Sequence, residues 1–277
     1  MNRRPGTTAP SRRGRPRPAG EGPDSTSDAA EVLYGVHPVL EALEAGRRTI
    51  DRILVARDGV SGLGRILRQA RESGVPVTHL PREVLARKVG RREVHQGVVA
   101  LVSAVPYADP EEICRAAASH ENGLLVALDG VEDPRNLGAT VRSSAAAGAD
   151  GMLLGLEGSV GLTAVAAKAS AGAVERLPIA REPRMRQRLL ALREAGFRVL
   201  GLDPRGASAW DGLELSGRNV LVAGGEGRGL RRSIAEVCEH RVLIPLEHGV
   251  ESLNVSVAVA VVLFEVVRQR RRAGKVG

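Results

Sequence analysis

Two hydroxyls and one amide stand at alternate positions near the end of the chain, at Ser252, Asn254 and Ser256. They follow a β-branched apolar stretch that Pro245 must end, and they precede an apolar run from Val257 to Phe264. The pattern predicts a strand, a polar loop and a final buried helix with Ser252 as its N-cap. Unpaired backbone N–H groups at a helix start attract polar or anionic ligands. Helix capping alone would explain the same residues.

A second polar group follows an apolar stretch that ends at Leu128. Asn136 is expected to cap the next helix, and Arg142 comes six residues later, nearly two turns on, so both can face one side of the strand end. An arginine there can bind a phosphate or stabilise a developing alkoxide. A capping asparagine with a surface arginine is the alternative.

A third group is the glycine-rich segment from Gly224 to Leu230, which includes Gly225, Glu226 and Gly227. The dinucleotide fingerprint requires a glycine at its sixth place, where this chain has Leu230, and the Walker pattern fails at the same point. We therefore expect the glycines to admit a flat adenosine close to the backbone, with Glu226 near the reacting groups. A tight turn with an exposed glutamate is the alternative.

Basic residues gather in three places along the chain. Residues 1–30 carry six arginines, and the last residues carry four arginines and Lys275, so the two ends supply most of the formal net charge of +8. The third place is a predicted loop with Arg87, Lys88, Arg91 and Arg92, which can hold backbone phosphate. For the loop, solvation alone is the alternative. The first 30 residues are too polar to fold and are expected to form a disordered basic arm that contacts nucleic acid loosely or has no partner.

The elements that must position these groups alternate between strand and helix. Residues 31–104 predict a small α/β unit, 105–122 a linker with a helix over 110–119, and 123–277 a second α/β domain. Such alternation favours a mostly parallel sheet with helices on both faces, and its ligands are expected beyond the carboxyl ends of the strands. The three polar groups all follow predicted strands, so we expect them to meet at one edge of the sheet.

Composition excludes several classes of protein. No apolar run is long enough to span a bilayer and no apolar segment follows the first arginines, which predicts a cytoplasmic protein with no membrane partner. The two cysteines and six histidines are scattered without metal-ligand spacing, so we expect neither a disulfide nor a metal site.

In this order and spacing, the three groups resemble the motifs of the SpoU/TrmH family of RNA ribose 2′-O-methyltransferases, within the SPOUT superfamily. The segments Tyr34–Pro38, His95–Val98 and Ser170–Ala173 resemble the subgroup that carries an N-terminal substrate-binding domain. The resemblance covers roughly residues 33 to 268. It implies an RNA substrate, S-adenosylmethionine as the methyl donor, a C-terminal trefoil knot and a homodimer that completes the site.

The resemblance also implies residue roles. Arg142 would be the central catalytic residue, with Asn136, Glu226, Ser252, Asn254 and Ser256 arranging the pocket. The cofactor would lie against Gly224, Gly225, Gly227, Ile244, Leu246 and Leu253. The basic cluster Arg87, Lys88, Arg91 and Arg92 would bind RNA.

The preferred hypothesis is methylation of a guanosine ribose in large-subunit (23S) ribosomal RNA. A transfer RNA methyltransferase or an antibiotic-resistance rRNA methyltransferase would share every motif. A catalytically silent RNA-binding assembly factor is a further alternative, which would fail to bind S-adenosylmethionine. A nicotinamide dehydrogenase is disfavoured because the glycine fingerprint is incomplete.

Overall fold

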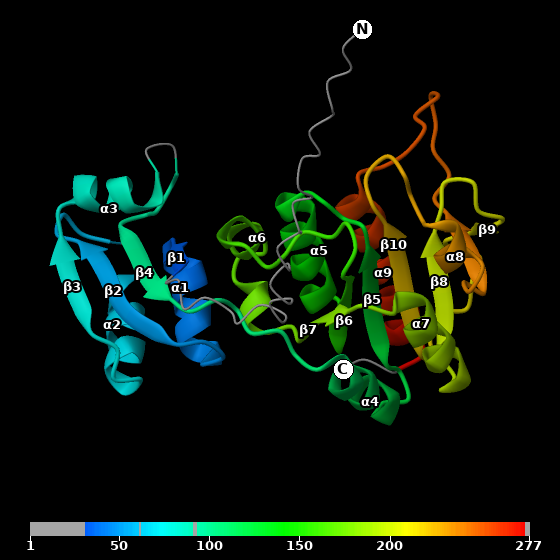
Figure 1. Ribbon diagram of the computed structural model, residues 1–277, viewed down its shortest axis with the longest axis horizontal. Coiled ribbons are helices and arrows are strands. Elements are labelled where there is room, and N and C mark those ends of the chain that lie inside the picture. Colours follow the sequence, from blue (N-terminus) through cyan, green and yellow to red (C-terminus); the bar gives the residue numbers. More distant parts are fainter. Residues whose placement is uncertain (1–30, 61, 91–92, 275–277) are drawn as a thin grey trace, which may run out of the picture.

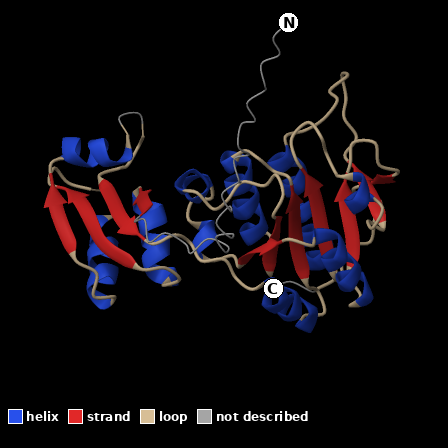
Figure 2. Cartoon of the chain, in the orientation of Figure 1, coloured by secondary structure: helices blue, strands red, loops and turns tan. Residues whose placement is uncertain are grey.

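The computed structural model describes residues 31–274 except 61, 91 and 92. The predicted basic arm, residues 1–30, therefore lies outside the described residues, as do Arg91 and Arg92 of the basic cluster. The described chain forms two α/β units side by side, each with its own sheet (Figure 1; Figure 2).

The first unit is a four-stranded sheet in the order β1-β4-β2-β3, in which only the β2–β3 pair is parallel. Its apolar faces are covered by α1 and α2 on one side and α3 on the other, as the two separate buried clusters indicate. Its elements are β1 (Glu31–Tyr34), α1 (Val36–Ala45), β2 (Ile50–Ala56), α2 (Leu63–Glu72), β3 (Val77–Leu80), α3 (Arg82–Val89) and β4 (Val98–Val102).

The second unit is a seven-stranded sheet in the order β7-β6-β5-β10-β8-β11-β9, and all its strand pairs are parallel. Its elements are α4 (Pro110–Ser119), β5 (Leu124–Asp129), α5 (Pro134–Ala146), β6 (Gly151–Gly155), α6 (Ala164–Ala169), η1 (Ala173–Glu175), β7 (Ile179–Glu182), α7 (Met185–Glu194), β8 (Arg198–Leu202), β9 (Ser208–Ala209), β10 (Asn219–Gly224), α8 (Arg232–Ala235), β11 (His240–Leu243) and α9 (Val255–Arg272). The predicted fold class is confirmed.

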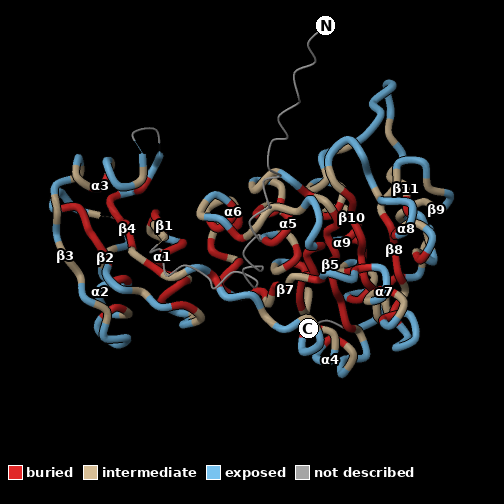
Figure 3. The backbone as a smooth tube through the Cα atoms, viewed as in Figure 1, coloured by how far each residue is buried: buried red, intermediate tan, exposed pale blue. Residues whose placement is uncertain are grey.

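Both faces of this sheet are buried. Along β5, Leu124, Val126 and Leu128 point into a core shared with α5, α6 and α9, whereas Leu125 and Ala127 point into a core shared with α4, α7 and α8. Figure 1 shows α7 in front of the sheet and α9 behind it, and Figure 3 shows the central strands buried between them. The continuous apolar strands follow from this double cover.

Two predicted helix caps are wrong, and both errors concern the site. Helix α5 begins at Pro134, because Asp133 caps it by accepting a hydrogen bond from Arg135 N (2.7 Å). An Asp–Pro pair suits the N-cap and first helical positions better than a later Asn does. Helix α9 is capped by Asn254, whose Oδ1 accepts from Ser256 N (2.9 Å), and Ser252 precedes it.

The structure also fixes boundaries that the sequence pattern leaves open. Strand β1 begins at Glu31, and strand β7 begins at Ile179, because Gly172 (φ +88°) starts a 3₁₀ turn before it. The helix that follows the glycine loop is short and spans Arg232–Ala235.

The final helix is only half buried, which corrects the expectation of a fully buried helix. Val259, Val262, Leu263 and Val266 pack into the core, but Val257 and Phe264 on the opposite face are 48% and 49% exposed. One helix face suffices to cover the sheet, so Val257 and Phe264 face outward in the single chain. None of the described helices is both long enough and apolar enough to cross a bilayer.

Candidate active site

A cavity of about 400 Å³ lies beyond the carboxyl ends of β8, β10 and β11, where α9 begins. All six residues predicted to hold a cofactor line it: Gly224, Gly225, Gly227, Ile244, Leu246 and Leu253. Glu226, Ser252 and Asn254 line it as well. The volume lies within the range of small-molecule sites, roughly 300–1,000 Å³.

Three loops that are far apart in sequence are joined by one chain of hydrogen bonds at the rim of this cavity. Asn136 Nδ2 donates to Glu226 Oε1 (2.6 Å), and Asn254 Nδ2 donates to Asn136 Oδ1 (2.9 Å). Ser256 Oγ then donates to Asn254 Oδ1 (2.7 Å). The polar groups therefore converge at one edge of the parallel sheet.

Glu226 anchors this chain as an ionised acceptor. Its second oxygen accepts a hydrogen bond from Glu132 N (3.1 Å) in the loop after β5. Partial burial would raise the pKa of Glu226, but the hydrogen bonds from Asn136 and from backbone amides outweigh burial and hold the pKa below its ordinary value. Glu226 is therefore a carboxylate at neutral pH, suited to orienting amides and not to proton transfer.

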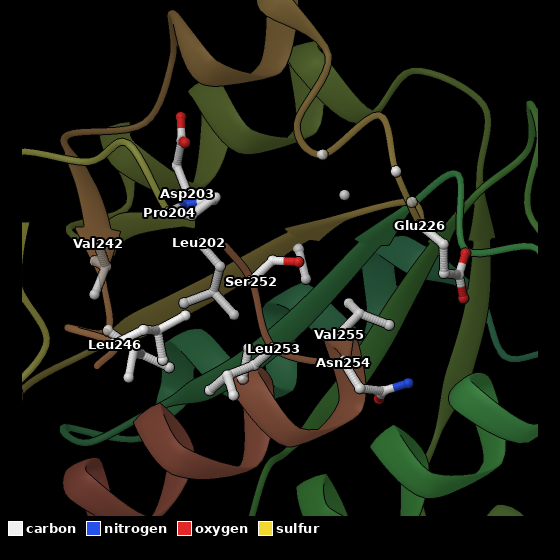
Figure 4. A pocket seen from close by; sticks show the side chains of 17 residues that line it. Leu202, Asp203, Pro204, Glu226, Val242, Leu246, Ser252, Leu253, Asn254 and Val255 are labelled. Atoms are coloured by element: carbon white, nitrogen blue, oxygen red, sulfur yellow. The ribbon is translucent and has the colours of Figure 1, made fainter. Parts of the chain in front are cut away.

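In Figure 4, Glu226 and Asn254 point to the same side, away from the apolar wall around Leu246 and Leu253. The cavity thus has two chemically different parts. Its apolar part also includes Leu202, Pro204 and Val242, and Asp203 adds a carboxylate. These four residues were not predicted. Leu202 ends strand β8, and Asp203 and Pro204 follow it, so the rule that ligands lie beyond the carboxyl ends of parallel strands would have found these three residues.

Glycine is required in this loop chiefly because the backbone packs too closely for a side chain, which refines the role predicted for these residues. A Cβ at Gly224 would lie 2.0 Å from Gly229 O, and a Cβ at Gly225 would lie 1.9 Å from Gly130 O. Gly227 and Gly229 have φ of +75° and +65°, so the turn between them also favours glycine. Packing of the glycine loop against the loop after β5 is what gives the cavity its backbone wall.

Arg142 lies apart from the hydrogen-bonded chain. It is exposed on α5, about 9 Å along the helix axis from Asn136. It does not line the cavity, and it makes no side-chain hydrogen bond or ion pair with any residue that the structure describes. It shares the outward face of α5 with Arg135, seven residues earlier. Its catalytic role stays a prediction.

The described part of the basic cluster lies on the first unit. Arg87 and Lys88 are exposed in the last turn of α3, and the following loop contains Glu93. Hydrogen bonds from Lys168 and Tyr34 hold the pKa of the Glu93 carboxyl below its ordinary value. In Figure 1, α3 lies on the side of the molecule toward which the carboxyl ends of β8 and β10 point, the side where the cavity lies.

Comparison with known proteins agrees with this geometry. The profile of the SpoU rRNA Methylase family matches residues 123–264, which include every loop of the site. The profile described as "RNA 2'-O ribose methyltransferase substrate binding" matches residues 32–108. The chain belongs to the SpoU rRNA methylase family. The resemblance noted from the motifs is confirmed.

Relatives and solved structures of this family cover most of the chain. A tRNA/rRNA methyltransferase of Mycobacterium avium is 41% identical over 250 residues, which are 90% of this chain and 81% of that protein. The SpoU methyltransferase AviRb of Streptomyces viridochromogenes, solved with AdoMet, has a TM-score of 0.74 at 25% identity and covers 88% of this chain and 91% of its own. An AdoMet-bound rRNA methyltransferase of Sinorhizobium meliloti has a TM-score of 0.71 at 25% identity, over 87% of each chain.

The chain is a SpoU-family RNA methyltransferase that uses S-adenosylmethionine, and its cavity suits that cofactor. Its lining combines backbone at Gly224–Gly227 with apolar side chains at Leu246 and Leu253, a combination that fits a flat adenine. Asp203 also lines the cavity, and its carboxylate is paired with Arg241 (2.7 Å). Among the described residues, no cluster of three or more His, Cys, Asp or Glu side chains is arranged to hold a metal ion.

Proposed function

We propose that this protein methylates a ribose 2′-oxygen in ribosomal RNA, with a guanosine of the large-subunit (23S) RNA as the expected target. The observation that supports the proposal most is the Glu226–Asn136–Asn254 chain, because it fixes two amides at the mouth of a cofactor-sized cavity. A ribose hydroxyl can both donate to and accept from such fixed neutral amides.

The bound S-adenosylmethionine supplies an already activated methyl group, so the protein must orient the ribose and manage one weakly acidic proton. Asn254, at the start of α9, is our candidate for contact with the ribose. Arg142 binds the adjacent phosphate and stabilises the incipient alkoxide, and that phosphate or a water accepts the proton. A guanidinium is too weak an acid to serve as the general base near neutral pH, since its pKa exceeds about 12.

We further infer that the protein works as a homodimer. Val257 and Phe264 lie seven residues apart on the outward face of α9, with the half-buried Val261 between them. This apolar stripe follows Asn254 and Ser256 directly along α9, so a second copy seated on it would reach the rim of the cavity. A second copy is a suitable occupant because each chain presents the same stripe to the other.

The role predicted for each part of the chain belongs to the proposal. Residues 31–104 bind structured RNA, and residues 105–122 connect the two units. Residues 123–277 bind the cofactor and form the trefoil knot near the glycine loop and α9. The cytoplasm, where ribosomal RNA is exposed, is the expected compartment. Transfer RNA is the second candidate substrate, because the Mycobacterium avium relative is described as a tRNA/rRNA methyltransferase.

The experiment is methyl transfer from labelled S-adenosylmethionine to unmodified ribosomal RNA, followed by mapping of the modified nucleotide. The expected result is one labelled ribose in the large-subunit RNA. Label in transfer RNA alone would show that the substrate is transfer RNA and not ribosomal RNA. Calorimetry with S-adenosylmethionine is the second readout, and a protein that binds RNA but not this cofactor would be an assembly factor.

A further inference from the structure

Both tyrosines of the chain border one groove between the two units. Tyr34 and Lys88 come from the first unit, Tyr107 from the connecting segment, and Leu162 and Val165 from the second unit. The groove has a volume of about 530 Å³, which is enough for a nucleoside. Tyr107 and Val165 are 40% and 43% exposed, so the groove has open apolar surface at its rim.

The Tyr107 ring is held rigidly although it is exposed. Its hydroxyl accepts a hydrogen bond from Leu162 N (3.0 Å), and the guanidinium carbon of Arg181 lies 5.3 Å from the ring centroid. Arg181 is itself fixed, because it donates to the carbonyls of Gly155 (3.3 Å) and Ser159 (3.2 Å). A fixed tyrosine backed by an arginine is a platform on which a nucleobase can stack without a large loss of side-chain entropy.

The groove offers one exposed cation without an ion pair. Its two lining carboxylates are both engaged: Glu93 pairs with Lys168 and accepts a hydrogen bond from the Tyr34 hydroxyl (2.9 Å), and Glu31 lies 3.5 Å from Arg48, which it shares with the buried Glu175. Lys88, in contrast, is exposed and has no ion-pair partner among the described residues. Lys88 is therefore the side chain that a phosphate in the groove would approach.

The groove is connected to the active site through a single loop. The residues that follow β6 border the groove at Leu162, and they bond to the loop after β5 through Gly130 N–Ser159 Oγ (2.9 Å) and Val160 N–Val131 O (2.9 Å). An RNA strand held in the groove would thus lie next to the loop that leads into α5, the helix that carries Asn136.

We propose that the groove binds an unpaired nucleotide of the RNA substrate, with its base stacked on Tyr107 and its phosphate near Lys88. This inference rests on the proposed function and adds a second recognition point beside the methylated ribose. Single-stranded bases are the recognisable part of folded RNA, because they expose a face for stacking. The groove would therefore select RNA in which an unpaired nucleotide lies near the target.

Replacement of the aromatic ring tests the proposal. Tyr107→Leu should weaken binding of a short fluorescein-labelled oligoadenylate about 5- to 150-fold in fluorescence anisotropy, the range expected for one stacked base. Tyr107→Phe keeps the ring and should stay within about twofold of the unaltered protein. Both variants should bind S-adenosylmethionine in calorimetry as the unaltered protein does, which shows that they fold. Equal oligoadenylate affinity in all three proteins, equal losses in both variants, or no binding by the unaltered protein would overturn the proposal.

A second pair of variants tests the phosphate contact and does not depend on the tyrosine. Lys88→Gln should lower the salt dependence of oligoadenylate binding by roughly one unit of log–log slope. Arg68→Gln is the matched control, because Arg68 is also exposed, on α2 away from the groove, and has no ion pair with another described residue. Equal effects of the two changes would count against the contact.

Methyl transfer separates this proposal from the proposed function. If the unaltered protein methylates ribosomal RNA and Tyr107→Leu leaves the KM for RNA unchanged, the groove proposal fails alone. If oligoadenylate binding depends on Tyr107 but no RNA is methylated, the proposed function fails and the groove stands. A raised KM with an unchanged kcat is the outcome expected when both hold.

Discussion

Arg231 makes two parallel hydrogen bonds to the carboxylate of Asp129, Nε to Oδ2 and Nη2 to Oδ1, each 2.6 Å long. Asp129 is the last residue of β5 and its side chain is fully buried, whereas Arg231 follows the glycine loop and its side chain is 45% exposed. The pair therefore fastens the end of the glycine loop to the neighbouring strand end. Neither residue was singled out from the sequence, because a buried aspartate and a distant arginine carry no joint pattern.

Loss of this pair should loosen the cavity. Arg231→Met is expected to lower the free energy of unfolding by about 1–3 kcal/mol, since it leaves the buried Asp129 carboxylate without its charged donor. Water can reach the half-exposed site, so the loss should be smaller than for a fully buried pair. Binding of S-adenosylmethionine should weaken as the glycine loop gains freedom. Chemical denaturation and calorimetry measure the two effects.

Arg232→Met is the matched control, because Arg232 is nearly fully exposed and pairs only with Glu236 one turn later. It should change stability by less than about 0.5 kcal/mol. If the two variants behave alike, Arg231 has no special part in holding the loop.

The second prediction concerns the pH dependence of Glu226. Its pKa is lowered in the folded protein, so its contribution to stability is complete above the ordinary value of 4.5 and is lost as the pH falls through the lowered pKa. The melting temperatures of the unaltered protein and Glu226→Gln should therefore differ by a constant amount at neutral pH and converge in acid. Thermal unfolding of both proteins, measured from neutral pH down into acid, would show this convergence.

The same argument predicts kinetics near neutral pH. Glu226→Gln should lower the rate without removing any titration from the pH–rate profile, because Glu226 does not change its charge there. A profile that loses a neutral-range pKa in this variant would make Glu226 an acid or base, contrary to its role as a fixed acceptor.

A third prediction concerns Arg142. Arg142→Lys should reduce kcat about 10²-fold or more, since an ammonium cannot supply two parallel donors to a phosphate and an alkoxide. S-adenosylmethionine affinity should be unchanged, because Arg142 does not line the cavity. Arg115→Lys, on the opposite face of the sheet in α4, is the control and should have no effect. A small loss of rate with an unchanged pH–rate profile would contradict the proposed role.

The architecture could be predicted because it depends on local patterns. Apolar runs ending in polar groups mark strands of a doubly covered parallel sheet, and their carboxyl ends must share an edge, so Asn136, Glu226 and Asn254 were expected together. The caps were predicted less well, since Asp133 and Asn136 can both cap a helix, and only the Pro134 that follows Asp133 separates them. Contacts between distant side chains, such as Asp129 with Arg231, depend on strand order, which periodicity does not encode.

A fourth prediction tests the dimer. Phe264→Glu should give a monomer in light scattering, because a charge in the outward stripe of α9 cannot be buried against a second copy. The rate of methyl transfer should fall when the dimer is lost, if the second copy completes the site. Leu67→Glu, at another exposed apolar residue on α2, is the control and should leave the oligomeric state unchanged. A monomeric unaltered protein would exclude the dimer.

The fifth prediction concerns the buried ion pair that joins the two units. Arg48 of the first unit pairs with Glu175 of the second, and both side chains are only 1% exposed. Glu175→Ala should cost about 3–5 kcal/mol and separate the unfolding of the two units into two calorimetric transitions, because it leaves the Arg48 guanidinium buried with only the more distant Glu31. The double variant Arg48→Met with Glu175→Leu should recover most of that loss, since no uncompensated charge remains. A double variant as unstable as Glu175→Ala would show that shape, and not charge, holds the units together.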